Sequence, residues 1–138
     1  MMFERVLVAV DGSPKSEKTI AIGLDMAQRY GSSVTVLHVR EYERYEGSDV
    51  DMGPPISAEQ LVDDVVTRFR DAGLEVHGEL RRVSSGETPQ QIVEIAEHVN
   101  ADLIILGSRG MTEWRSLLLG GVATKVVHHA KSPVLLVR

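Results

Sequence analysis

The sequence predicts an α/β protein with an open, five-stranded parallel sheet that is covered by helices on both faces. Short continuous apolar runs alternate strictly with segments whose apolar residues recur at helical spacing. This alternation is typical of parallel sheets whose strands are buried on both sides. The length of 138 residues fits one domain, residues 1–138, with enough buried surface for a core.

The first two strands are expected at residues 6–10 and 34–39, which are short runs rich in β-branched and aliphatic residues. Between them, Ser13 and Pro14 match an N-cap followed by proline at the first helical position. Residues 40–56 are acidic and polar, and we expect a long loop there. Loops of this length inside compact domains are usually functional or mobile.

The second half continues the same alternation. A capping box at residues 57–60 opens a helix, and another at 88–91 opens the next. Residues 74–83 alternate apolar with charged side chains, which is typical of a half-exposed edge strand. Further apolar runs predict two more strands, with a glycine-punctuated loop that runs into the last helix between them: residues 103–106, 134–137 and 107–121.

Composition excludes several classes of protein. The chain has no cysteine, which excludes a disulfide framework, a zinc-thiolate site and cysteine catalysis. Its net charge of −5 disfavours nucleic-acid binding, which needs clustered Lys and Arg. No apolar stretch approaches the roughly 20 residues of a membrane span or the pattern of a signal peptide. We therefore expect a soluble, cytoplasmic protein with no nucleic-acid or membrane partner.

Two strand ends carry the candidate site, because ligands of open parallel sheets bind beyond the carboxyl ends of the strands. Residues 10–13 follow the first strand and residues 107–110 follow the fourth. Glycines let a ligand approach the backbone, and the N-termini of the following helices favour an anion. Asp11 either binds the ligand or caps the turn before the helix, and Arg109 either adds a cation or faces water.

The common phosphate and nucleophile motifs are missing. No G-x-G-x-x-G follows the first strand, Lys15-Ser16 lacks the glycines of a P-loop, and no G-x-S-x-G elbow occurs. What remains is the spacing Gly107-x2-Gly110-x9-Gly120 between the fourth strand and the last helix.

This spacing resembles the universal stress protein family, and the resemblance covers essentially the whole chain. It includes Val-Ala-Val-Asp-Gly-Ser at 8–13, His-Val at 38–39, the segment 101–110, Val-Val-His-His at 126–129 and Ser-Pro-Val-Leu-Leu-Val at 132–137. The resemblance implies a strand order of 3-2-1-4-5. It also implies a homodimeric stress-response regulator, not an enzyme, that binds an adenine nucleotide (ATP, ADP or AMP) with Mg²⁺ held by the phosphates.

The resemblance also assigns roles to individual residues. Hydrophobic side chains would line the base pocket, backbone atoms of the second strand would meet adenine, and an aspartate would contact the ribose or the base. Glycines and the start of the last helix would hold the ribose and phosphates. The base pocket would be lined by Ala9, Val10 and Leu106, adenine would meet Val39, and the aspartate is Asp11. The ribose and phosphates would be held by Gly107, Arg109, Gly110, Gly120, Gly121, Val122 and Ala123.

The chain departs from the family pattern at two positions near the phosphates. The family expects Ser or Thr at the position of Gly121, and often a second hydroxyl at the position of Ala123. A hydrogen bond to a charged group contributes roughly 1.5–3 kcal/mol, so losing two weakens triphosphate binding by about two to four decades. The departure favours AMP, ADP or a cyclic nucleotide over ATP.

The last strand predicts a partner. Residues 134–137 are continuously apolar, and an exposed edge strand of this kind invites pairing with another chain. A two-fold homodimer through residues 133–137 would cover it, and the family resemblance implies the same contact.

Three alternatives stay open or are disfavoured. Slow ATP hydrolysis lacks a visible general base with an orienting partner. A phospho-acceptor receiver domain needs an acidic pair after the first strand, where Asp11 stands alone. A dimeric interaction module of the same fold that binds no nucleotide remains open because of Gly121 and Ala123.

Overall fold

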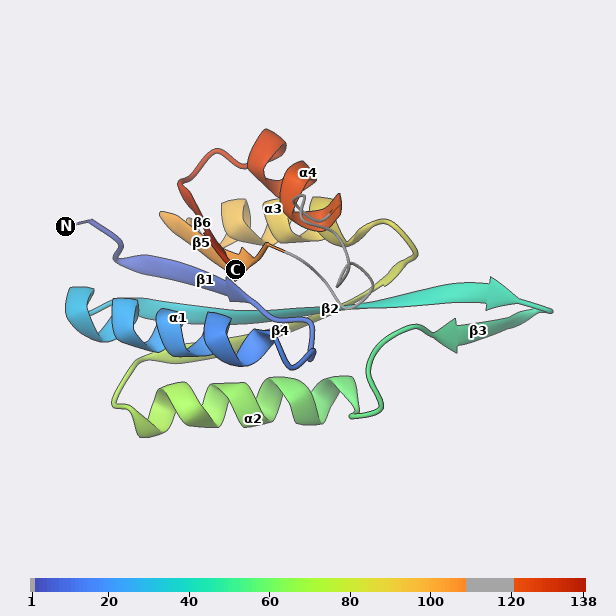
Figure 1. The fold of residues 1–138 in the computed structure, drawn as a ribbon, viewed down its shortest axis with the longest axis horizontal. Coiled ribbons are helices and arrows are strands. Elements are labelled where there is room, and N and C mark those ends of the chain that lie inside the picture. The colour runs from blue at the N-terminus through green and yellow to red at the C-terminus, as the bar shows by residue number, and fades with distance from the viewer. Residues whose placement is uncertain (1, 109–120) are drawn as a thin grey trace.

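The computed structural model describes residues 2–108 and 121–138, and these ranges form a six-stranded sheet with helices on both faces (Figure 1). The elements are β1 (Arg5–Ala9), α1 (Ser16–Tyr30), β2 (Ser33–Tyr45), β3 (Ser48–Asp51), α2 (Ala58–Asp71), β4 (Val76–Ser84), α3 (Thr88–His98), β5 (Leu103–Gly107), α4 (Gly121–His129) and β6 (Val134–Val137).

Five of the strands are parallel and lie in the order β4-β2-β1-β5-β6, which is the order 3-2-1-4-5 in terms of the predicted strands. The predicted α/β class is therefore confirmed, as are the five parallel strands, but the sheet has a sixth strand that was not predicted, because β3 pairs with β2 in antiparallel fashion. Val6 and Val8 pack in the core cluster of α1 and α2, whereas Leu7 packs in the cluster of α3 and α4. Because both faces of β1 are buried from Val6 to Val8, these residues are all apolar.

The expected long loop at residues 40–56 is wrong for most of its length. β2 continues to Tyr45, and β3 pairs with its far end in antiparallel fashion. The connecting residues Glu46 and Gly47 both have positive φ angles (48° and 81°), as in the two-residue turns that match strand twist. This hairpin projects from the body of the protein (Figure 1). Its residues are exposed, so no buried face imposed an apolar alternation on the sequence.

Two helix starts also differ from the prediction. α1 begins at Ser16 with Lys15 at the N-cap, so Ser13 and Pro14 lie in the preceding turn. The hydroxyl of Thr88 donates to Glu41 Oε2 at 2.5 Å and does not cap α3. The cap at Ser57 is confirmed, since its hydroxyl accepts the Gln60 N–H at 3.1 Å.

The start of the last helix near Leu118, expected from the sequence, lies outside the described residues. Within residues 2–108 and 121–138, no helix combines the length and the apolar character needed to cross a membrane.

Candidate functional site

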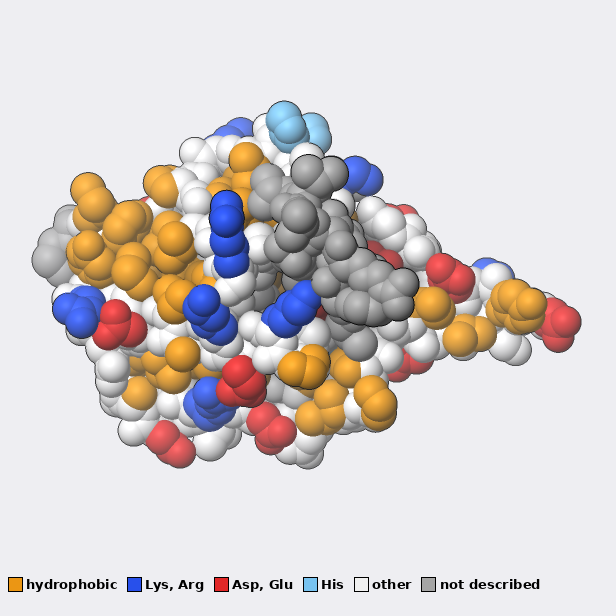
Figure 2. Space-filling view, in the orientation of Figure 1, with side chains coloured by type: hydrophobic (Ala, Val, Ile, Leu, Met, Phe, Trp, Pro, Cys, Tyr) orange, Lys and Arg blue, Asp and Glu red, His pale blue; other side chains and the backbone are white. Residues whose placement is uncertain are grey.

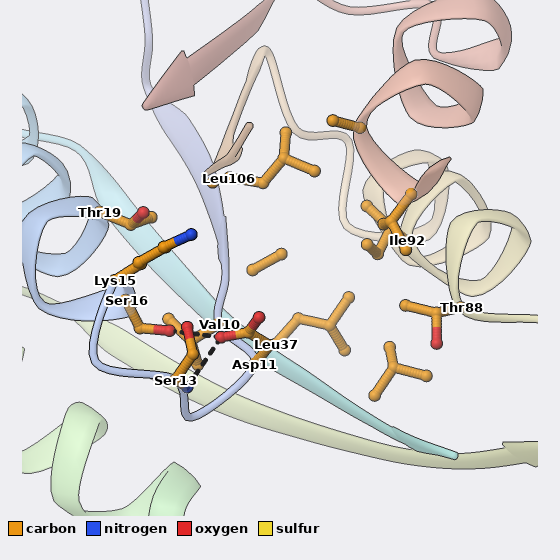
Figure 3. A pocket seen from close by; sticks show the side chains of 15 residues that line it. Val10, Asp11, Ser13, Lys15, Ser16, Thr19, Leu37, Thr88, Ile92 and Leu106 are labelled. Carbon is orange, nitrogen blue, oxygen red and sulfur yellow. Dashed lines mark hydrogen bonds between the residues drawn. The ribbon is translucent and has the colours of Figure 1, made fainter. Parts of the chain in front are cut away.

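A cavity of about 100 Å³ lies at the carboxyl ends of β1 and β5 and beside the middle of β2, next to the N-termini of α1 and α3. This volume is several times the roughly 10–15 Å³ that one water molecule requires. Figure 3 shows Lys15 and Asp11 on one side of the cavity and Thr88 and Ile92 on the other. The described lining residues are Ala9, Val10, Asp11, Ser13, Lys15, Ser16, Thr19, Leu37, Val39, Thr88, Ile92, Leu106, Gly107, Val122 and Ala123.

Asp11 uses one carboxylate oxygen to hold the turn after β1. Its Oδ1 accepts the Ser13 N–H at 2.9 Å and the Ser16 hydroxyl at 2.7 Å (Figure 3). Within the described part of the chain, the structure records no hydrogen bond to Oδ2. Asp11 therefore caps the turn before α1, which is one of the two roles that the sequence suggests. Its second oxygen stays available at the cavity.

The neighbouring Gly12 explains why this turn needs a glycine. Its φ angle is +82°, and a Cβ at this position would overlap the side chains of Leu61 and Pro54. A residue with a side chain would meet both a left-handed backbone conformation and a filled space. The loop that carries Asp11 thus packs directly against the segment that follows β3.

The backbone of Val39 opens towards the cavity. On this side of β2, the Leu37 carbonyl accepts the Val10 N–H at 2.9 Å and the Glu41 carbonyl accepts the Met52 N–H at 2.9 Å. Alternate residues of a strand direct their N–H and C=O groups to the same side. The N–H and C=O of Val39 therefore lie on this side of β2, between the bonds made by Leu37 and Glu41. The β1 register ends at Leu37, and no bond to Val39 from this side is recorded in the described ranges.

His38, beside Val39, is 2% exposed, and its Nδ1 lies 2.8 Å from the carbonyl oxygen of Val10. A carbonyl oxygen can only accept, so Nδ1 carries the proton. Burial lowers the pKa of His38 from its ordinary value of 6.5, and the positive charge of Arg40 lowers it further, against the raising effect of the Val10 carbonyl. The ring is a neutral donor.

The predicted site residues fall into three groups. Gly121 is exposed at the start of α4, beside the cavity residue Val122. Arg109, Gly110 and Gly120 lie outside the described residues. The others line the cavity: Ala9, Val10, Asp11, Val39, Leu106, Gly107, Val122 and Ala123.

Sequence reasoning missed several lining residues. In the sequence, Lys15 stands out only because Lys15-Ser16 lacks the glycines of a P-loop. In the structure it is the N-cap of α1 and the one cation among the described lining residues. Thr88 and Ile92 belong to α3, and the capping box at the start of that helix was the available signal. Their approach to the cavity depends on how α3 packs across β2, which the local sequence does not encode.

Residues 2–138 match the Universal stress protein family, so the chain belongs to this family of α/β proteins. A universal stress protein of Thermus aquaticus, encoded in the QAH/OAS sulfhydrylase 3′ region, is 32% identical and covers 99% of this chain and 100% of its own length. The fold is similar to a universal stress protein structure from Archaeoglobus fulgidus, with a TM-score of 0.77, 28% identity and coverage of 99% and 100%. An Archaeoglobus fulgidus universal stress protein in complex with dAMP has a TM-score of 0.71, 27% identity and complete coverage (100%) of both chains.

Proposed function

We propose that the cavity binds an adenine nucleotide and that the protein is a homodimeric, nucleotide-responsive regulator of the stress response, not an enzyme. The observation that carries the proposal is the open backbone of Val39 at the edge of the cavity. It offers one N–H donor and one carbonyl acceptor, side by side, within reach of a ligand.

This pair of backbone groups matches one edge of adenine. The ring nitrogen N1 accepts and the exocyclic N6 amine donates, which complements the donor and acceptor of Val39. The walls suit a flat aromatic ring, since Ala9, Leu106 and Val122 are aliphatic. Pockets of this type combine apolar walls with a few convergent polar groups that fix the orientation of the ligand.

The remaining polar groups suit the ribose and phosphates. Asp11 Oδ2 is positioned to accept a ribose hydroxyl, and Lys15 supplies a positive charge at the cavity (Figure 3). Gly121 and Ala123 offer no hydroxyl at the start of α4, so the contacts fit a short phosphate tail better than a triphosphate. The dAMP complex of the Archaeoglobus fulgidus relative supports an adenine nucleotide with one phosphate as the ligand class. Any Mg²⁺ would be held by the phosphates themselves.

The homodimer is proposed through residues 133–137. β6 pairs with β5 on one side, and the described residues form no ladder on its other side. Figure 2 shows apolar side chains gathered on the side of the molecule that carries the N-terminus in Figure 1. Met2 is 68% exposed and Leu135 is only partly buried. A second copy related by a two-fold axis would cover both the strand edge and these side chains.

The test is calorimetric titration of nucleotide-stripped protein with AMP, ADP and ATP, each with Mg²⁺. We expect micromolar binding of AMP that weakens about 10-fold or more in Asp11→Asn, which keeps the oxygen for the turn but removes the charge. Asp63→Asn, at an exposed position of α2, is the matched control and should bind as the wild type does. Absence of binding by all three nucleotides would overturn the proposal.

A double variant separates loss of the ligand from loss of the site. Gly121→Ser with Ala123→Ser restores the two missing hydroxyls and should shift the preference towards ATP. If the wild type binds nothing and the double variant binds ATP, the protein is the ligand-free dimeric module that the sequence left open.

A further inference from the structure

We propose that His38 is a positioning residue that ends the hydrogen-bond ladder between β1 and β2 and thereby leaves the backbone of Val39 open to a 6-aminopurine. The inference deepens the proposed adenine site and rests on it. Val10, His38 and Val39 come from two adjacent strands, and their hydrogen bonds carry the argument.

A regular parallel ladder would continue one step beyond the observed one. Leu37 receives the N–H of Val10, so the next bond in the pattern would join the N–H of Val39 to the carbonyl of Val10. The structure records no such bond between these described residues. The carbonyl of Val10 accepts from the His38 ring at 2.8 Å instead.

The His38 ring is suited to hold this arrangement. Its side chain is buried, and its Nε2 has no hydrogen-bond partner among the described residues. The charged groups that act on it are Arg40, Asp11 and Asp51. Because burial keeps the ring neutral and the carbonyl fixes the proton on Nδ1, His38 presents one permanent donor to Val10.

The consequence for the ligand is a choice between purines. With its bond to Val10 replaced, Val39 presents an N–H next to a carbonyl, and neither group is bonded from this side by the described residues. A 6-aminopurine complements this pair, whereas hypoxanthine and guanine place a protonated N1 and a carbonyl oxygen there and meet donor with donor. His38 therefore sets base selectivity without touching the base.

Two substitutions separate the donor from the bulk of the ring. In His38→Asn the side-chain amide nitrogen lies near the position of Nδ1, so it can still donate to Val10 and should rescue the wild-type behaviour. His38→Leu fills similar space without a donor, which frees the Val10 carbonyl for Val39. His77→Leu, at an exposed histidine of β4, is the control for loss of a histidine.

The first measurement is the scalar coupling through the hydrogen bond between Val39 N–H and Val10 C=O, recorded by NMR without nucleotide. We expect no coupling in the wild type, His38→Asn or His77→Leu, and a coupling in His38→Leu. A coupling in the wild type, or none in a folded His38→Leu variant, would overturn the proposal. Should His38→Leu fail to fold, a wild-type coupling or a coupling in His38→Asn still overturns it.

The second measurement is the ratio of AMP to IMP affinity. We expect about 10- to 100-fold preference for AMP in the wild type and His38→Asn, and a ratio near one in His38→Leu. An unchanged ratio in His38→Leu would contradict the role in selectivity. If the wild type binds no nucleotide while its ladder is open, the adenine site itself is overturned and the effect of His38 on the ladder stands.

Discussion

The guanidinium of Arg40 donates to the carbonyl oxygen of Pro54 at 2.9 Å, and its side chain is completely buried. A second bond joins it to the carbonyl of Ile56 at 2.7 Å, and Asp51 lies 3.5 Å away. Pro54 packs against Gly12 in turn, next to Asp11. The chain that returns from the β2–β3 hairpin is thereby fastened to β2 and held against the loop of the candidate site.

Replacing Arg40 should therefore destabilise the fold. Arg40→Met retains most of the stem but leaves two carbonyl groups without their donor, and each buried unsatisfied group costs about 1–3 kcal/mol. We expect the free energy of unfolding to fall by about 2–5 kcal/mol in urea denaturation. Arg44→Met is the control, because Arg44 lies on the same strand in an exposed pair with Asp49 and should cost less than about 1 kcal/mol. Equal losses for the two variants would contradict this account.

Gly12 should tolerate alanine poorly for two separate reasons. Its positive φ angle costs about 1–2 kcal/mol for a residue with a Cβ, and the added methyl group would also overlap Leu61 and Pro54. Gly31→Ala isolates the first cost, because Gly31 has a φ of +64° with no atom within 4 Å of an added Cβ. We expect thermal and urea unfolding to show a clearly larger loss for Gly12→Ala. Comparable losses would mean that the contact with Pro54 does not constrain the loop.

The sequence predicted the parts of the fold that burial dictates. Val6, Leu7 and Val8 serve two cores at once, and that requirement is visible as an unbroken apolar run. Tyr45, by contrast, is 67% exposed in the hairpin, so this end of β2 carries no buried face from which a period could be read. Pairing with β3 was decided by the turn at Glu46 and Gly47, a weaker signal than a core.

The same distinction holds for the candidate site. Asp11 and Gly107 sit at strand ends, and the rule that ligands bind there locates them from sequence alone. Lys15 and Thr88 reach the cavity only because of where their helices begin and how they pack. The bond between His38 and Val10 joins two adjacent strands, and neither residue's local sequence indicates that the two meet.

Burial of His38 predicts a loss of stability in mild acid. Its pKa in the folded state lies below the ordinary value of 6.5, so the unfolded chain takes up a proton first as the pH falls. The stabilisation is complete above about pH 6.5 and declines below it, with a limiting slope of about 1.4 kcal/mol per pH unit. The gap in unfolding free energy between the wild type and His38→Asn should narrow in this range. A gap that stays constant from about pH 5 to 8 would show that the pKa of His38 is the same in the folded and the unfolded protein.

The dimer proposal predicts a specific effect at β6. Leu135 is partly buried against the core of α1 and α2, and in the proposed dimer a second copy would complete its burial. Leu135→Glu would place a charge at that contact, where desolvation without a partner is costly. Sedimentation equilibrium should show a dimer for the wild type and a monomer for this variant. Val127→Glu, at a 44% exposed position of α4, should remain dimeric. A wild-type protein that is monomeric at all concentrations would contradict the dimer proposal. The unpaired backbone groups at the edge of β6 would then be protected by the flanking residues Pro133 and Arg138 instead of by a second copy.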